Sequence, residues 1–157
     1  MTAGFVSQAR EDVMAWKYRK LIANLGNGVG ASFVDNAAAD ELLRLARAEG
    51  EEVLAAAGID AVSAQADQDR RGEHIVRRAH REKASGGSST WQSVARGAGS
   101  VEIDYLSGEI VMLGRLHGVP TPVNEYVQET TARLARDRLA PGSIDAAEFL
   151  DGLLASR

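Results

Sequence analysis

The spacing of the apolar residues is the strongest constraint on the fold, because most hydrophobic segments of the chain repeat with the period of a helix. In residues 11–29 the apolar positions lie three or four apart, as expected for one stripe of an amphipathic helix. This stripe consists of Met14, Tyr18, Leu21, Leu25 and Val29. The best candidate for a strand, residues 109–113, lies within a longer run that has the same helical spacing. The pattern therefore predicts an all-α fold.

Glycine, proline and capping residues divide the chain into separate helical segments. Gly58 and Gly118 each follow an apolar periodic run, where a helix commonly ends. Ser89 and Ser143 each precede a short run and predict N-terminal caps. The expected helical segments are residues 11–29, 35–57, 62–84, 89–96, 101–117, 123–138 and 143–154. We expect one bundle of six or seven helices that spans residues 1–157 as a single domain.

Composition excludes several classes of protein. No apolar run approaches the roughly 18 residues that a membrane helix needs, and the first ten residues lack the pattern of a signal peptide. The chain has no cysteine, which removes disulfides and thiolate sites and fits the reducing cytoplasm. Its net charge is −4, so a phosphate backbone is not the expected partner. We expect a cytoplasmic protein that binds neither membrane nor nucleic acid.

The charged segment at residues 67–83 contains a basic run and a competing acidic one. The basic residues are Arg70, Arg71, Arg77, Arg78, Arg81 and Lys83, and the acidic ones are Asp67, Asp69, Glu73 and Glu82. Because the two signs alternate, the segment favours a solvated helix face over a nucleic-acid surface. The three histidines, His74, His80 and His117, do not have the spacing of metal ligands, so we expect no metal site.

Residues 24–33, NLGNGVGASF, contain an apparent dinucleotide-binding fingerprint. Gly26, Gly28 and Ala31 match G-x-G-x-x-A. A cofactor loop of this type must follow a hydrophobic strand, whereas the preceding residues, WKYRKLIA, carry three cations and follow the helical stripe. The sequence therefore disfavours a cofactor loop here. Glycines that allow a neighbouring helix to approach, or that interrupt the helix, are the alternative.

Polar residues in the same region lie close together on the expected helix. At about 100° per residue, Lys20, Asn24 and Asn27 fall within roughly 60° of one another, to one side of the apolar stripe. Such a face is either a solvated surface or an ammonium and two amides directed into a cleft. Spacing alone does not decide between the two.

Three segments together resemble a known family. They are WKYRKLIANLGN at residues 16–27, SSTWQSVARG at residues 88–97 and EIDYLSGEIVMLGRLHGVPTPVNE at residues 102–125. Their order and separation are similar to those of the C-terminal substrate domain of ketopantoate reductases (2-dehydropantoate 2-reductases). The resemblance covers about residues 3–135.

The resemblance implies a fold and a reaction. In the family, a helical C-terminal domain of the 6-phosphogluconate dehydrogenase type completes an active site whose NADPH is bound by an N-terminal Rossmann domain. The reaction reduces ketopantoate, a 2-keto acid, on the route to pantothenate. This chain resembles the C-terminal domain alone, so we expect the Rossmann domain to be absent, NADP to bind weakly if at all, and the isolated chain to be inactive. The uncovered domain-facing surface would favour a homodimer.

The family's active-site residues map onto two parts of the sequence. The catalytic Lys corresponds to Lys20, and the first substrate-binding Asn corresponds to Asn24. The second Asn of the family falls on Gly28, and Asn27 lies one residue early. We infer that Asn27 takes over the substrate contact through a local helix distortion helped by Gly26 and Gly28.

The remaining candidates lie in the second and third segments. Ser89 corresponds to the family's substrate-binding Ser, and Glu102 to its active-site Glu, which can pair with the lysine. The loop between them is one residue longer than usual. Without the resemblance, a plain helix cap and a carboxylate anchor are equally favoured for Ser89, and a first-turn acid stabilised by the helix dipole is favoured over an active-site role for Glu102. We expect Asp104 and Asn124 to be structural.

The alternative to a reductase domain is a stand-alone helical interaction or oligomerisation module.

Overall fold

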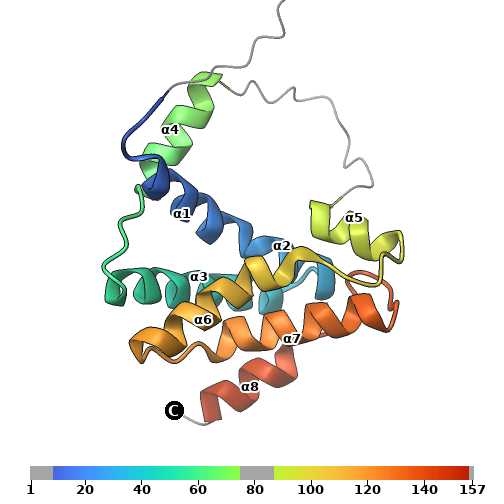
Figure 1. The fold of residues 1–157 in the computed structure, drawn as a ribbon. Helices are drawn as coiled ribbons and strands as arrows, with labels where there is room; N and C mark the ends of the chain where they lie inside the picture. The colour runs from blue at the N-terminus through green and yellow to red at the C-terminus, as the bar shows by residue number, and fades with distance from the viewer. Residues whose placement is uncertain (1–8, 75–86, 156–157) are drawn as a thin grey trace, which may run out of the picture.

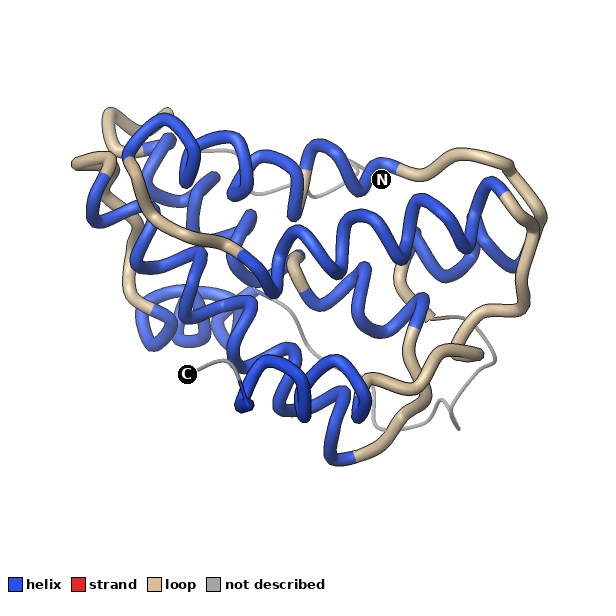
Figure 2. Tube along the Cα trace, turned by 90° about the horizontal axis from the view of Figure 1, so that it is seen from below, coloured by secondary structure: helices blue, strands red, loops and turns tan. Residues whose placement is uncertain are grey.

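The computed structural model describes residues 9–74 and 87–155, and within them the chain forms eight α-helices and one 3-10 helix (Figure 1). The elements are α1 (Val13–Asn24), α2 (Gly26–Ser32), α3 (Ala37–Ala56), α4 (Ala64–His74), α5 (Ser89–Ala95), η1 (Glu102–Tyr105), α6 (Ser107–His117), α7 (Pro122–Arg136) and α8 (Ala147–Ala155). Figure 2 shows no strand in these residues, where the only extended pairing is an isolated bridge between Phe33 and Ile144. The predicted all-α fold is confirmed.

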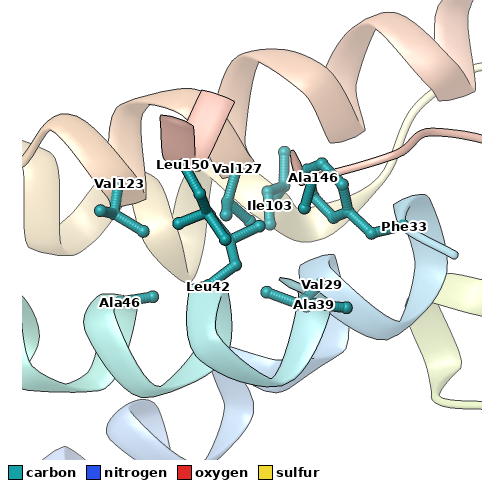
Figure 3. Close-up of a cluster of buried hydrophobic side chains, with 10 residues drawn as sticks. All are labelled: Val29, Phe33, Ala39, Leu42, Ala46, Ile103, Val123, Val127, Ala146 and Leu150. Carbon is teal, nitrogen blue, oxygen red and sulfur yellow. The ribbon is translucent and has the colours of Figure 1, made fainter. Parts of the chain in front are cut away.

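Helices α3 and α7 form the centre of the bundle. Both contact α2, α6 and each other, α3 also contacts α1 and α8, and α7 also contacts α5 and η1. Figure 3 shows the largest buried cluster, in which side chains from these elements point toward one another. Its buried members are Val29, Phe33, Ala39, Leu42, Ala46, Ile103, Val123, Val127, Ala146 and Leu150. Helix α4 lies apart from this core and contacts α1 (Figure 1).

The helical segment predicted over residues 11–29 is formed as two helices, α1 and α2, with an interruption at Leu25, one residue before Gly26. Most of the predicted stripe faces the core, since Leu25 and Val29 are buried and Tyr18 and Leu21 pack against the core, and the departures are at Ile22 and Met14. Ile22 is 1% exposed, whereas Met14 is 50% exposed. Ile22 packs with Leu25 and with Ile110 of α6, so the helix that α1 contacts determines which face is buried.

Other helix ends differ from the prediction. The expected helix over residues 101–117 is divided into η1 and α6, because Leu106 has the non-helical angles φ −116° and ψ −94°. The last helix begins later than Ser143, and the Asp145 carboxylate accepts a hydrogen bond from the Ala147 N–H. Of the charged segment predicted over residues 62–84, the structure describes a helix at Ala64–His74, and the rest lies outside the described residues. Gly58, with φ 65°, ends α3 as predicted.

The segment after α7 closes one side of the bundle. Val34 N–H donates to Ile144 O at 2.8 Å, Ile144 N–H to Ser32 O at 3.1 Å and Gly142 N–H to Ala31 O at 2.9 Å. These bonds hold the connection along the end of α2, and α8 then adds Ala146 and Leu150 to the core. None of the described helices combines the length and apolar character needed to cross a bilayer.

A half-buried carboxylate connects α3 to the start of α7. Glu49 accepts hydrogen bonds from Val123 N–H, Asn124 N–H and Asn124 Nδ2, each at 2.9 Å. Asn124 Nδ2 also donates to Ala46 O at 2.9 Å. The carboxylate therefore satisfies N–H groups that the first turn of a helix leaves without intrahelical partners. Burial raises the pKa of Glu49, although the three N–H donors act in the opposite direction.

We predict that Glu49→Gln lowers the free energy of unfolding by about 1–3 kcal/mol, because an amide NH₂ replaces one acceptor and leaves an N–H group unpaired. Urea denaturation at neutral pH measures the effect. Glu52→Gln is the matched control, since Glu52 is exposed on the same helix, and its effect should stay within about 0.5 kcal/mol. Equal losses in the two variants would contradict the role of Glu49.

We also predict that the difference in stability between the wild type and Glu49→Gln depends on pH. A carboxyl whose pKa is raised by folding binds its proton more tightly in the folded state, so protonation stabilises the fold. The wild type should therefore gain stability relative to Glu49→Gln as the pH falls through the raised pKa toward the ordinary value of 4.5. A difference that shrinks over this range would contradict the raised pKa.

Candidate functional site

The three polar residues predicted to share a helix face lie on both sides of the interruption between α1 and α2. Lys20 is exposed on α1, Asn24 is the half-buried last residue of α1, and Asn27 is half-buried in the first turn of α2. Leu25 keeps helical angles, and its N–H is shared between Leu21 O at 3.2 Å and Ile22 O at 3.3 Å. The interruption is therefore a local tightening of the helix, and the two asparagines remain on successive turns.

Gly28 lies where helix α2 meets the core, and the structure explains why no side chain occupies this position. A Cβ atom there would lie 2.7 Å from Ile103 Cδ1 and 2.9 Å from Val127 Cγ1. Both distances are shorter than van der Waals contact. A substrate-binding amide cannot occupy position 28 while this packing persists, whereas Asn27 lies outside the contact.

Ser88 connects α2 to the first turn of α5. Its hydroxyl donates to Asn27 O at 3.3 Å and accepts from Trp91 N–H at 3.3 Å. Ser88 is thus the cap of α5, and the prediction that Ser89 caps this helix was wrong. Ser89 is instead the first helical residue and is exposed. The contact places Ser88, the cap of α5, beside Asn27.

Ser89 and Glu102 line the same surface hollow. This hollow has a volume of about 370 Å³ and lies between α5 and η1. Its lining residues are Ser89, Thr90, Ser93, Ser100, Val101, Glu102 and Tyr105. Glu102 is the exposed first residue of η1, and its neighbour Ile103 is buried beneath it. The structure therefore brings together two predicted site residues that are separated by thirteen positions.

The structure does not bring every candidate into this hollow. Lys20, Asn24 and Asn27 are not among its lining residues, and within the described part of the chain no carboxylate lies within ion-pair distance of the Lys20 ammonium. The expected pairing of Lys20 with Glu102 is therefore not formed here. Larger hollows of about 1090 Å³, between α7 and α8, and about 610 Å³, at the start of α1, contain none of the predicted site residues.

Two motif residues have structural contacts. Asp104 accepts a hydrogen bond from Gln128 Nε2 at 2.7 Å, which joins η1 to α7. Asn124 is fully buried and bonds to Glu49 and Ala46, as described above. These contacts agree with the expected structural role of both residues.

Sequence analysis missed the link made by Ser88 and the hydroxyls of Ser93 and Ser100. Ser88 lies three residues before Trp91, which is the spacing of a cap, but Ser89 lies at the same distance from Gln92. Only the contact with Asn27 distinguishes the two. Ser93 and Ser100 occupy one hollow because the chain turns at residues 96–101, where the sequence predicts a break between two helices but not the direction of the turn.

No dinucleotide loop or metal cluster is found in the described residues. The G-x-G-x-x-A match lies on α2 and follows helix α1 rather than a strand. Groups of three or more histidine, cysteine, aspartate or glutamate residues that could hold a metal ion do not occur in residues 9–74 and 87–155. The candidate site consists of Lys20, Asn24 and Asn27 on α1 and α2, with a separate hollow beside α5 that Ser89 and Glu102 line.

The fold and site define a helical domain that presents polar side chains at the junction of α1, α2 and α5. The profile of a family described as "Ketopantoate reductase PanE/ApbA C terminal" matches residues 12–135. The chain belongs to this family. No significant match is found among curated proteins.

A solved structure has the same fold. The crystal structure of a PanE/ApbA family ketopantoate reductase from Ralstonia eutropha JMP134 matches with a TM-score of 0.59 and 28% sequence identity. The match covers 77% of this chain and 41% of that chain. This chain thus corresponds to about two fifths of the longer protein.

We predict that Gly28→Ala destabilises the fold by about 1–3 kcal/mol, because the added methyl group overpacks the contact with Ile103 and Val127. Gly30→Ala is the control on the same helix. No atom lies within 4 Å of a Cβ at position 30, so this change should be neutral or stabilising by up to about 1 kcal/mol. Thermal denaturation of both variants is the test, and a stable Gly28→Ala variant would show that the contact can relax.

Proposed function

We propose that this chain is the substrate-binding helical domain of an NADPH-dependent 2-keto acid reductase that acts on ketopantoate or a related 2-keto acid. The observation that carries the proposal is the position of the family match. Residues 12–135 include all five candidates, which are Lys20, Asn24, Asn27, Ser89 and Glu102. The absence of cysteine is compatible with the cytoplasm as the site of this reaction.

Lys20 can act as the general acid that reduction of a ketone requires. Transfer of a hydride to the keto carbon leaves a negative oxygen that must be stabilised and protonated. An exposed ammonium such as that of Lys20 supplies both the positive charge and the proton. Before the reaction, the same charge attracts the carboxylate of a 2-keto acid.

The two asparagines would orient the substrate beside the lysine. Asn24 follows Lys20 by one helical turn, so the two side chains lie on neighbouring positions of one face. Asn27 would supply the second amide, in place of a residue that the packing at Gly28 excludes. Glu102 and Ser89 would hold the distal part of the substrate in the hollow between α5 and η1.

The described residues lack the strand–loop–helix unit that binds a dinucleotide in a Rossmann domain. They contain neither a strand nor a glycine-rich loop of the dinucleotide type, so a separate Rossmann domain would hold NADPH. When bound there, the reduced nicotinamide supplies the hydride. In this proposal residues 1–157 form one helical domain, and this domain would contribute the residues that bind the substrate.

An interface with another domain is compatible with the exposed apolar residues of α1 and α6. Met14 of α1 is 50% exposed, and Met112 and Leu116 of α6 are 47% and 70% exposed. Ile22 of α1 and Leu113 of α6 belong to one buried cluster, which also contains Val53 and Leu54 of α3. A covering domain or a second copy of this chain would remove such a surface from water. The same surface would serve a stand-alone interaction module, which is the alternative function.

We predict that the purified chain does not oxidise NADPH in the presence of ketopantoate, because the cofactor site lies on another domain. The absorbance of NADPH follows the reaction, and a complete two-domain ketopantoate reductase serves as the positive control. Steady turnover by this chain alone would contradict the proposal that a separate domain binds NADPH.

We predict that Lys20→Ala weakens binding of ketopantoate by about tenfold, since one charge-assisted hydrogen bond is lost. Chemical shift changes of the ¹⁵N-labelled chain measure the affinity. Lys17→Ala is the matched control, because Lys17 is also exposed and lies one turn earlier on α1. Equal weakening by both variants would indicate non-specific attraction. Absence of any ketopantoate-dependent shift would favour the interaction module.

A further inference from the structure

Asn27 lies between two glycines, so its neighbours in the chain restrain its backbone little. Gly26 and Gly28 have no side chain, and glycine restricts the backbone angles less than any other residue. Asn27 is half-buried, and within residues 9–74 and 87–155 its side-chain amide makes no hydrogen bond. The amide is therefore available to a ligand, and its position depends on how firmly other elements hold this turn of α2.

Two contacts hold this turn from outside α2. The packing of Gly28 against Ile103 and Val127 restrains one side. On the other side, the Ser88 hydroxyl donates a hydrogen bond to Asn27 O at 3.3 Å. No other hydrogen bond between described residues joins α2 to residues 87–95. The bond acts on the backbone of the same residue whose side chain is the candidate substrate contact.

Helix α5 gives Ser88 a firm support. Val94 of α5 is buried in a cluster with Leu134 of α7. Before the helix, a Cβ atom at Gly87 would lie 2.6 Å from Trp91 Cγ, so the chain enters α5 packed against the first turn of that helix. The Ser88 hydroxyl also accepts a hydrogen bond from Trp91 N–H at 3.3 Å. The hydroxyl is therefore fixed to α5, which is itself anchored on α7.

We propose that Ser88 is a positioning residue for Asn27, and that its hydrogen bond to Asn27 O holds the Asn27 amide in the place from which it binds the substrate. The inference rests on the proposed function for the role of Asn27. In this role Ser88 acts through Asn27 and does not itself contact the substrate. Because the same hydroxyl also caps α5, the experiment must separate the cap from the bond to Asn27.

Three substitutions separate the two roles of the hydroxyl. Ser88→Asp keeps the cap, because a carboxylate also accepts a hydrogen bond from Trp91 N–H, but it removes the donor to Asn27 O. Ser88→Gly removes the donor without adding a charge, and glycine weakens a helix cap only slightly. Ser88→Thr keeps both the donor and the acceptor. Positioning therefore predicts that Thr restores what Asp and Gly lose, whereas a cap alone predicts similar behaviour of Asp and Thr.

The first measurement needs no ligand. The heteronuclear NOE of the ¹⁵N-labelled chain reports backbone motion on the picosecond to nanosecond timescale. Ser88→Asp and Ser88→Gly should lower this NOE at the Asn27 and Gly28 amides, while the melting temperature of Ser88→Asp stays close to that of the wild type because the cap is kept. Ser88→Thr should leave the NOE unchanged. An unchanged NOE at Asn27 in both Ser88→Asp and Ser88→Gly would overturn the proposal.

The second measurement is the affinity for ketopantoate, followed by chemical shift changes. Ser88→Asp should bind about threefold to tenfold more weakly, as expected for the loss of about one net hydrogen bond, and Ser88→Thr should bind like the wild type. Ser63→Asp is the matched control. Ser63 caps α4 by accepting from Ala66 N–H at 3.1 Å, and within the described residues its hydroxyl donates to no other helix. Equal weakening by Ser63→Asp would assign the effect to the added charge and overturn the proposal.

The two measurements also distinguish failure of this inference from failure of the proposed function. Ketopantoate shifts at Asn27 with an affinity that Ser88→Asp leaves unchanged would overturn the inference alone. A lowered NOE at Asn27 in Ser88→Asp, without any ketopantoate shift in the wild type, would support the hold of Ser88 on Asn27 and overturn the proposed function. Neither a ketopantoate shift nor a change in the NOE would overturn both.

Discussion

The close approach of Gly28 to Ile103 and Val127 sets how near α2 lies to η1 and α7, and two candidate site residues are neighbours of this contact. Gly28 follows Asn27 on α2, and Ile103 follows Glu102 on η1, so the close approach of one pair fixes the separation of the other. Helix α5 rests on α2 through Ser88, which brings Ser89 into the same arrangement. A methyl group at position 28 would therefore move site residues as well as core residues.

Helical periodicity was sufficient to predict the fold class and most helices, because burial of one face is a local property of the sequence. It did not predict that Ile22 is buried and Met14 is exposed, because the edge of the buried face of α1 depends on the residues that pack against it. It also missed the division of residues 101–117, since Leu106 departs from helical angles without a proline or glycine at that position. The apolar Leu116 fits the helical pattern and is 70% exposed, so pattern alone did not establish its burial.

The site was less accessible to sequence reasoning than the fold. The resemblance to ketopantoate reductases supplied the candidates, and the structure explains the departure at position 28 as a packing constraint. The pairing of Ser89 with Glu102 in one hollow depends on a turn that two left-handed glycines form, and the lining hydroxyls come from residues far apart in helical register. The sequence predicts a break between residues 96 and 101, but not the direction in which the chain turns there.

The family match ends at residue 135, yet the fold does not. The connection through Gly142 and Ile144 runs along the end of α2, and α8 covers the core from below in Figure 1. Phe149 of α8 stacks on Tyr126 with ring centres 3.9 Å apart, and Tyr126 in turn lies against Phe33. A domain boundary drawn where the family match stops would expose these rings to water. The structural unit for grafting or fusion therefore extends through α8, well beyond the segment that carries the family signature.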